Sequence, residues 1–232
     1  MSLKKGFLKK KNFLDKKDHT KIIKLILKNI KIKKNDIKLI SKKIIDNYKN
    51  NNSSIRVLQD KLKKSSIIKK ISKNKKYQKK LSSIIKNNNK CLFVDFNFRI
   101  DLPNIFKKED KKMSLPWHQD LSYYQHKTDL DNYDGYAIYI PLFKLGSKEG
   151  SLIIDQKQTN KLRKHKTKYL DVKNKKFLRH KLENYKPKKK IYINLIEREA
   201  LLMNFFCIHK SGKNISSKVR FTLLVRYKFL KN

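Results

Sequence analysis

The chain has 232 residues, enough for one domain with a sizeable core, and its 61 Lys and Arg against 19 Asp and Glu give a formal net charge of +42. Such a surplus ordinarily indicates nucleic acid or an anionic membrane surface as partner. Only seven of the basic residues are arginines, however, and the chain is crowded with Asn and Ile, which share A/T-rich codons with Lys. Because Arg makes the bidentate contacts to phosphate and guanine, we favour compositional drift over selection for polyanion binding.

The two cysteines, Cys91 and Cys207, are too few and too far apart to indicate a disulfide framework, which favours a reducing compartment. The N-terminus carries charge but no signal-peptide pattern, and no stretch approaches the roughly 20 apolar residues of a membrane span. We therefore expect a cytoplasmic protein with no membrane span. The sequence makes no prediction of its oligomeric state.

Residues 18 to 86 show the periodicity of amphipathic helices. Isoleucine and leucine recur at spacings of three and four residues, first over 22–30 and again over 37–45. Polar breaks at 50–54 and 87–90 divide this region, which predicts two or three helices whose Lys-rich faces meet solvent.

After residue 90 the sequence changes to short aromatic and β-branched runs separated by turns. Strands are predicted over 91–100, 135–142, 151–155, 191–196, 200–208 and 219–229. Six or more short strands are typical of a sandwich or barrel. The basic segment 157–190 is poor in apolar residues, and we expect a long loop or short helices there.

The sequence Trp117-His118-Gln119-Asp120 is followed 91 positions later by His209. Two imidazoles and one carboxylate on one face of a metal suit non-haem iron(II), because three coordination positions stay open. In an extended segment His118 and Asp120 point to the same side, and His209, at the end of an apolar strand, can complete the set. A lone His-x-Asp pair would be weak evidence for a metal site, but the pair together with His209 is stronger evidence.

Arg220 lies 11 residues after His209 within the last predicted strand. A buried guanidinium beside the metal can bind a carboxylate through two parallel hydrogen bonds, and the far end of 2-oxoglutarate presents such a group. Thr222 shares a strand face with Arg220 and can add a hydroxyl contact.

With these residues the sequence resembles the phytanoyl-CoA dioxygenase family of iron(II)/2-oxoglutarate oxygenases. The resemblance covers roughly 91–229 and rests on Arg220 and on PWHQD at 116–120, IPL at 140–142, GSL at 150–152 and HKSGKN at 209–214. It implies an α+β fold with a mainly β core, a jelly-roll or cupin-like double-stranded β-helix with N-terminal helices packed on it. We expect one oxygenase domain over 1–232, helical to residue 90 and catalytic from 91 to 232.

The resemblance also implies iron(II) bound by His118, Asp120 and His209, with 2-oxoglutarate and dioxygen as co-substrates, and a salt bridge from Arg220 to 2-oxoglutarate. Family members place a hydroxyl and an aromatic residue against this co-substrate, which here correspond to Ser211 and Tyr139. The family's usual Gly-Asp before the second histidine strand is Arg198-Glu199 here, a departure that affects substrate identity more than iron binding.

Substrate contacts are harder to predict than metal ligands. Arg99, Trp117 and Gln119 are candidates, although Trp117 equally suits core packing and Arg99 could pair with a neighbouring aspartate. His126, His165 and His180 lie in basic or loop segments, where we expect solvated side chains.

The predicted function is hydroxylation of a small molecule with decarboxylation of 2-oxoglutarate to succinate. Asp120 argues against a related halogenase, in which a small residue replaces the carboxylate. Two alternatives stay open: a nucleic-acid demethylase of the same superfamily, suggested by the Arg220 and Arg226 spacing and the net charge, and a catalytically inactive basic binding module.

Overall fold

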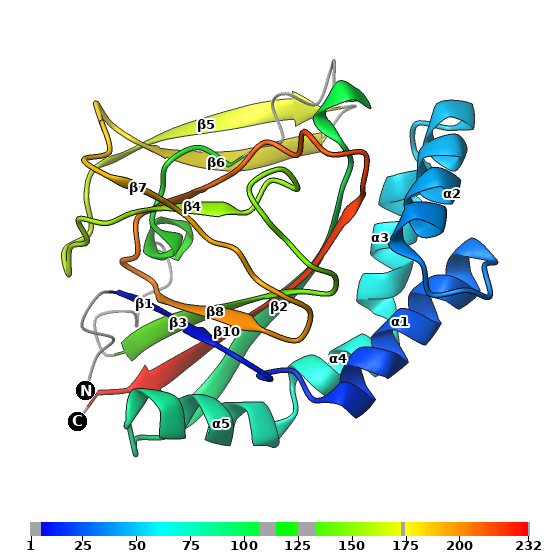
Figure 1. The fold of residues 1–232 in the computed structure, drawn as a ribbon. Coiled ribbons are helices and arrows are strands. Elements are labelled where there is room, and N and C mark those ends of the chain that lie inside the picture. The colour runs from blue at the N-terminus through cyan, green and yellow to red at the C-terminus, as the bar shows by residue number, and fades with distance from the viewer. Residues whose placement is uncertain (1–5, 107–114, 125–132, 173–174, 232) are drawn as a thin grey trace.

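The computed structural model describes residues 6–106, 115–124, 133–172 and 175–231. Its N-terminal part is helical: α1 (Lys16–Ile30), α2 (Ile37–Asn50), α3 (Ser54–Lys64), α4 (Ser66–Ser72) and α5 (Lys75–Ile85). Side chains cap several of these helices, because Asp36, Ser65 and Asn74 accept hydrogen bonds from backbone N–H groups of α2, α4 and α5. Figure 1 shows the helices along one side of the β-structure.

The β-structure consists of two facing sheets and a separate hairpin. The larger sheet has the order β1 (Phe7–Lys10), β8 (Ala200–Asn204), β3 (Tyr133–Pro141), β10 (Arg220–Leu230) and β2 (Cys91–Asp101). The smaller sheet has the order β7 (Lys190–Tyr192), β4 (Leu152–Asp155) and β9 (His209–Ser211), and β5 (His165–Val172) pairs with β6 (Lys175–Leu182). All these pairings are antiparallel, as in a double-stranded β-helix.

The alternation of side chains along β10 divides the interior into two layers. Phe221, Leu223 and Val225 belong to a core cluster that also contains the buried isoleucines of the helices, so this face of the sheet packs against the helical layer. Leu224 instead joins a second cluster, with Tyr139, Leu201 and residues of the smaller sheet. The inner face, between the two sheets, therefore carries Arg220, Thr222 and every second residue beyond them.

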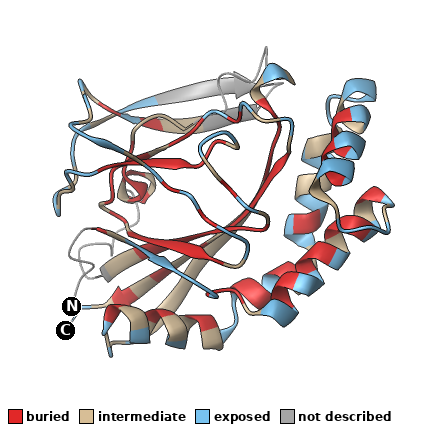
Figure 2. Ribbon diagram, in the orientation of Figure 1, coloured by how far each residue is buried: buried red, intermediate tan, exposed pale blue. Residues whose placement is uncertain are grey.

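Burial follows these layers in Figure 2, where β4, β8, much of β3 and β10, and one face of α1 and α2 are buried, whereas β1 and β7 at the sheet edges are mostly exposed. The helices are also joined to the sheet by polar contacts. The Nε2 atom of His19 in α1 lies 2.8 Å from the carbonyl oxygen of Leu142, and the hydroxyl of Tyr227 donates to the carbonyl oxygen of Ser72. The predicted fold class is confirmed, with the N-terminal helices on the outer face of the larger sheet.

Several predicted elements were wrong in detail. The described chain contains five α-helices instead of two or three, because short turns at 51–53, 65 and 73–74 interrupt the periodicity. The predicted loop at 157–190 contains the β5–β6 hairpin, whose strands pair with each other and need little apolar surface. The predicted strand 200–208 ends at Asn204, and His209 begins β9 in the other sheet. The short strand β1 was not predicted.

Among the described residues, no helix is long and apolar enough to cross a membrane.

Gly135 in β3 supports the inner layer by having no side chain. A Cβ built there would lie 2.0 Å from the Cδ2 atom of Phe205, whose ring stacks at 5.2 Å on Tyr124 next to the site described below. We expect Gly135→Ala to lower the free energy of unfolding by about 1–3 kcal/mol, because a packed ring must move. Gly146→Ala is the control, since its Cβ would closely meet only the carboxylate at the end of the Glu149 side chain, at 3.1 Å. Equal stability of the two variants in urea denaturation would contradict this packing.

Candidate metal centre

The two histidines of the predicted triad are joined through their backbones. The N–H of His118 donates to the carbonyl oxygen of His209 at 2.9 Å, and the N–H of His209 donates to that of His118 at 3.1 Å. This reciprocal pair is an antiparallel bridge between the 115–120 segment and β9. It places the imidazole rings side by side, with their centroids 4.3 Å apart.

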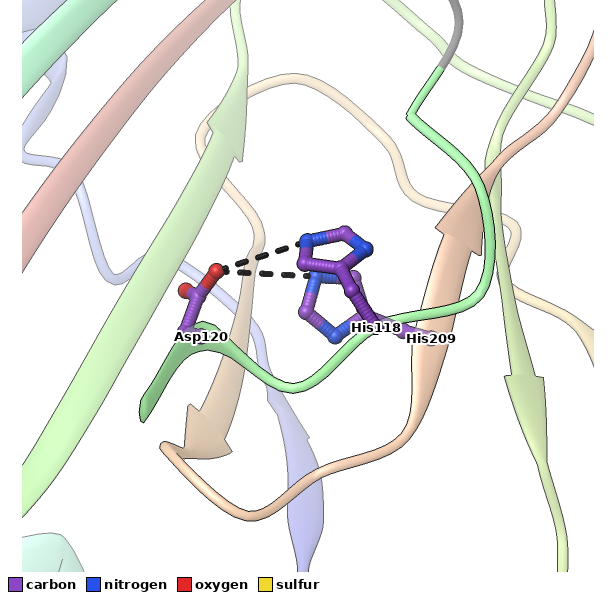
Figure 3. Close-up of side chains that lie close together, drawn as sticks. All are labelled: His118, Asp120 and His209. Atoms are coloured by element: carbon purple, nitrogen blue, oxygen red, sulfur yellow. Dashed lines mark ion pairs between the residues drawn. The ribbon is translucent and has the colours of Figure 1, made fainter. Parts of the chain in front are cut away.

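Asp120 joins the two imidazoles because the chain is extended between the ligands. Gln119 has φ −117° and ψ 135°, so His118 and Asp120 project to the same side, as predicted. The Oδ1 atom of Asp120 lies 3.6 Å from Nε2 of His118 and 4.0 Å from Nε2 of His209, and all three side chains are buried. Figure 3 shows the carboxylate directed at both rings.

The orientation of the rings fits metal binding. The Nδ1 atom of His118 lies 2.8 Å from the carbonyl oxygen of Pro116, and Nδ1 of His209 lies 2.9 Å from that of Cys207. Each ring therefore donates through Nδ1 and presents the lone pair of Nε2 toward the centre. Nε2 of His118 is buried without a hydrogen-bond partner, and a bound cation would give its lone pair a partner. The three residues offer ligand atoms within 4.8 Å of one another.

The protonation states also suit a cation. Burial, reinforced by the neighbouring His118, lowers the pKa of His209 to about 4, so the ring is neutral at neutral pH. Burial alone would raise the pKa of Asp120, but the charge of Arg226 and contact with His118 outweigh it, and the pKa is lowered. Burial raises the pKa of the Cys207 thiol well above its usual value, with Asp120 adding to the shift. A protonated thiol is a poor metal ligand, so Cys207 acts here as a buried packing residue.

Arg226 holds the carboxylate of Asp120 in place, a contact that the sequence analysis missed. Its Nε donates to Oδ2 of Asp120 at 3.4 Å, and its Nη1 donates to Oδ1 of Asp95 at 3.0 Å. The hydroxyl of Tyr124 donates to the other oxygen of Asp95 at 2.9 Å, and the Tyr124 ring stacks on Phe205. Arg226 binds Oδ2 of Asp120, so Oδ1 is directed at the two histidines.

Arg220 and its predicted companions gather further along the same inner face. The guanidinium of Arg220 donates to Oδ2 of Asp101 through Nη2 at 2.8 Å and Nε at 3.1 Å, and Nη1 donates to the carbonyl oxygen of Gly150. Burial would lower the pKa of Arg220, but Asp101 raises it, so the charge is secure. The hydroxyl of Thr222 donates to that of Tyr139 at 3.2 Å.

The second histidine motif and the GSL sequence meet where Arg220 reaches the smaller sheet. Ser211 pairs with Leu152 across β9 and β4 and is buried. Gly150, with φ +78°, lies so close to the turn after β9 that a Cβ would meet the backbone nitrogen of Asn214 at 2.7 Å. Ser211 is thus placed on the strand of His209, two residues beyond it.

The three candidate substrate residues have different surroundings. Arg99 lies on the inner face of β2 and donates to Oδ1 of Asp101 at 3.0 Å. Trp117 packs edge-on against Tyr185 with ring centroids 6.0 Å apart, which favours the packing role.

Gln119 is fully buried and all its side-chain polar atoms contact the main chain. Its amide nitrogen donates to the carbonyl oxygens of Lys161 and Phe206, at 3.0 and 2.8 Å, and its amide oxygen accepts from the N–H of Arg163 at 2.8 Å. The side chain therefore joins the loop after β4 and the turn before His209 to the segment that carries His118 and Asp120.

The expectation of solvated histidines was wrong for His180, which is buried with its ring edge-on to Tyr123 at 4.4 Å. His165 is half-buried, and its Nε2 accepts from the N–H of Gln119 at 3.2 Å. Tyr123 in turn lies edge-on to His118, so a layer of aromatic side chains extends from the metal ligand to β6. His126 lies outside the described residues.

One sequence signal could have located the missed acids. Asp95 and Asp101 are six residues apart, as are Arg220 and Arg226. In an antiparallel pair such equal spacings put both opposite charges in register, and the structure pairs Arg220 with Asp101 and Arg226 with Asp95.

A double-stranded β-helix that encloses two imidazoles, one carboxylate and inward-facing arginines defines the class of non-haem iron oxygenases. A family model confirms this: residues 3–222 match the phytanoyl-CoA dioxygenase family, and the chain belongs to it. The predicted family is thus confirmed. No curated protein matches the chain in sequence.

Solved structures share the fold at low identity. The α-ketoglutarate-dependent epimerase SnoN from nogalamycin biosynthesis is 7% identical, with a TM-score of 0.56 over 98% of this chain and 77% of its own. The non-heme monooxygenase ThoJ is 12% identical, with a TM-score of 0.54 over 97% and 74%. EvdO2 from Micromonospora carbonacea var. aurantiaca is 15% identical over 74% of this chain, with a TM-score of 0.49, and the match spans only 63% of EvdO2.

The hydrogen bonds of Gln119 generate a stability prediction. Gln119→Leu preserves the volume but leaves two carbonyl oxygens and one N–H of the buried backbone without their partner, so we expect the free energy of unfolding to fall by about 2–4 kcal/mol. Gln156→Leu, at an exposed position nearby, is the matched control and should change it by less than about 0.5 kcal/mol. Denaturation of both metal-free variants measures the difference, and similar losses would show that the buried amide has no special role.

Proposed function

We propose that the protein binds iron(II) through His118, Asp120 and His209 and hydroxylates a small molecule, converting 2-oxoglutarate to succinate. The observation that carries the proposal is the set of three convergent ligand atoms, which includes a buried imidazole nitrogen without a protein partner. Residues 1–232 would act as one oxygenase domain, because the helices and the outer face of the larger sheet share one hydrophobic core.

Bound iron(II) would supply dioxygen activation coupled to the oxidative decarboxylation of 2-oxoglutarate. The protein's part is to fix three ligands on one side and leave the opposite side open. The backbone bridge sets the spacing of the imidazoles, and the carbonyl oxygens of Pro116 and Cys207 select their tautomers. Arg226 orients the carboxylate of Asp120.

Arg220 is the proposed partner of the distal carboxylate of 2-oxoglutarate. Its Nε and Nη2 contact Asp101 from one side, and this ion pair fixes the guanidinium in a buried position. Each Nη atom carries a second hydrogen, and this pair can bind a carboxylate end-on while Asp101 remains in place. Thr222 and Tyr139, on the same inner face, would contact the same carboxylate, and Ser211 the co-substrate from β9.

Hydroxylation is favoured over halogenation because Asp120 occupies the ligand position that a halide would need. The identity of the substrate can be tested by screening small metabolites for stimulated succinate release in the presence of iron(II). Methylated oligonucleotides in the same screen test the demethylase alternative, and a protein that binds neither iron nor 2-oxoglutarate would support the inactive binding module.

The metal ligands are tested by Asp120→Ala and His209→Ala. Each variant removes one of only three protein ligands, so we expect iron(II) affinity to fall by at least about 100-fold and succinate formation to reach background. Asp60→Ala, which removes an exposed carboxylate of α3, is the control and should behave as the wild type. Retained iron binding in His209→Ala, measured by anaerobic equilibrium dialysis, would contradict the assigned triad.

The role of Arg220 predicts a separation of two affinities. Arg220→Leu removes a buried charged donor, so we expect the KM for 2-oxoglutarate to rise about 100-fold or more while iron(II) affinity stays near the wild-type value. Arg220→Lys keeps the charge without the paired donors, so its KM for 2-oxoglutarate should lie between those of the wild type and of Arg220→Leu. Arg56→Leu, at a solvent-exposed ion pair, is the matched control. An unchanged KM in Arg220→Leu would place the co-substrate elsewhere.

A further inference from the structure

The arginines are distributed unevenly in this lysine-rich chain. Seven arginines stand against 54 lysines, and among the described residues no lysine is buried. Three arginines, Arg99, Arg220 and Arg226, occupy inward-facing positions of β2 and β10. Where composition drifts toward lysine, an arginine on the inner face indicates a need for its rigid, planar set of donors.

Two of these guanidiniums share one carboxylate. Asp101 accepts from Arg220 through Oδ2 and from Arg99 through Oδ1. The three side chains carry one net positive charge, and they differ in exposure: the side chain of Arg220 is 7% exposed and that of Arg99 is 22% exposed. Arg99 is therefore the member of the group that an anion can reach from outside while Arg220 is occupied.

Arg179 in β6 is a third guanidinium, and it interacts electrostatically with Arg99 and Asp101. The backbone N–H of His180 donates to the hydroxyl of Tyr123 at 3.4 Å, so β6 lies against Tyr123 at this position. Burial lowers the pKa of Arg179, and the like charge of Arg99 lowers it further. Tyr123 and Asp101 act in the opposite direction and raise it. The Tyr123 ring contacts the ring of His118, so Tyr123 links this position of β6 to the candidate metal centre.

We propose that Arg99, assisted by Arg179, binds an anionic group of the substrate, a carboxylate or a phosphate, while Arg220 holds the distal carboxylate of 2-oxoglutarate. This inference rests on the proposed function, since it assigns a second anion to the inner face that carries Arg220. The anion would be bound by Nη1 and Nε of Arg99, atoms for which Asp101 is not the acceptor. The substrate is then a small organic acid or phosphate ester whose reacting carbon faces the metal ligands.

The small number of arginines makes a direct test possible. A chain with seven arginines gives seven Nε–H signals in a nitrogen-15 NMR spectrum, and individual Arg→Lys variants assign them. Zinc(II) replaces iron(II) so that the metal is diamagnetic. The protein with zinc is titrated first with 2-oxoglutarate, and then, at saturation, with acetate in one arm and sulfate in the other.

We expect 2-oxoglutarate to shift the signal of Arg220, and acetate or sulfate then to shift those of Arg99 and Arg179 along one saturable curve. A response to acetate alone would indicate a carboxylate substrate and a response to sulfate alone a phosphate-like one. Arg56 and Arg163, which are exposed, should show no saturation. In Arg99→Leu the dissociation constant, followed on Arg179, should rise about 10-fold or more.

The two proposals fail in different ways. If 2-oxoglutarate shifts Arg220 but neither anion shifts Arg99 saturably, Arg99 only braces Asp101 and the inference is overturned while the proposed function stands. If 2-oxoglutarate itself shifts Arg99 as strongly as Arg220, Arg99 belongs to the co-substrate site, which also overturns the inference. If 2-oxoglutarate leaves Arg220 unchanged, the proposed function itself is wrong.

Discussion

The site depends on one pair of backbone hydrogen bonds, between His118 and His209. The two residues are 91 positions apart, and nothing in their side chains would keep two imidazoles in contact against the cost of ordering the chain. Two main-chain bonds formed in both directions fix their relative position as rigidly as a strand pair. The remaining parts of the site orient groups around this bridge. Gln119 binds the main chain of the turn before His209, and Arg226 binds the carboxylate of Asp120 and so orients it toward the two histidines.

The larger sheet separates two kinds of physical chemistry. Its outer face is apolar and packs against the helices, which supplies the hydrophobic free energy of the fold. Its inner face carries alternating charges, Asp95 with Arg226 and Asp101 with Arg220, which would be costly if they were not paired. Because successive residues of one strand serve the two faces, the apolar packing and the proposed co-substrate contacts are encoded in the same eleven residues of β10.

The sequence predicted the parts of the fold that depend on local periodicity and the convergence of residues in a spaced motif. His118, Asp120 and His209 come together as predicted, because two-residue alternation directs two of them to one side, and Arg220 and Thr222 share a strand face as predicted. It did not predict the contacts of Gln119 or the pairing of Arg226 with Asp120, since these depend on which strands become neighbours. The β5–β6 hairpin was not predicted because its strands carry few apolar residues, so the hydrophobic pattern did not indicate strands there.

The central claim is that the bridge between His118 and His209 holds a single iron(II) together with Asp120. X-ray absorption at the iron edge of the anaerobic, iron-loaded protein tests this most directly, because it counts the rings and atoms bound to the metal. The account predicts two imidazole nitrogens, oxygen for the remaining ligands and no sulfur. A sulfur atom, which would implicate Cys207, or fewer than two imidazole rings would contradict it.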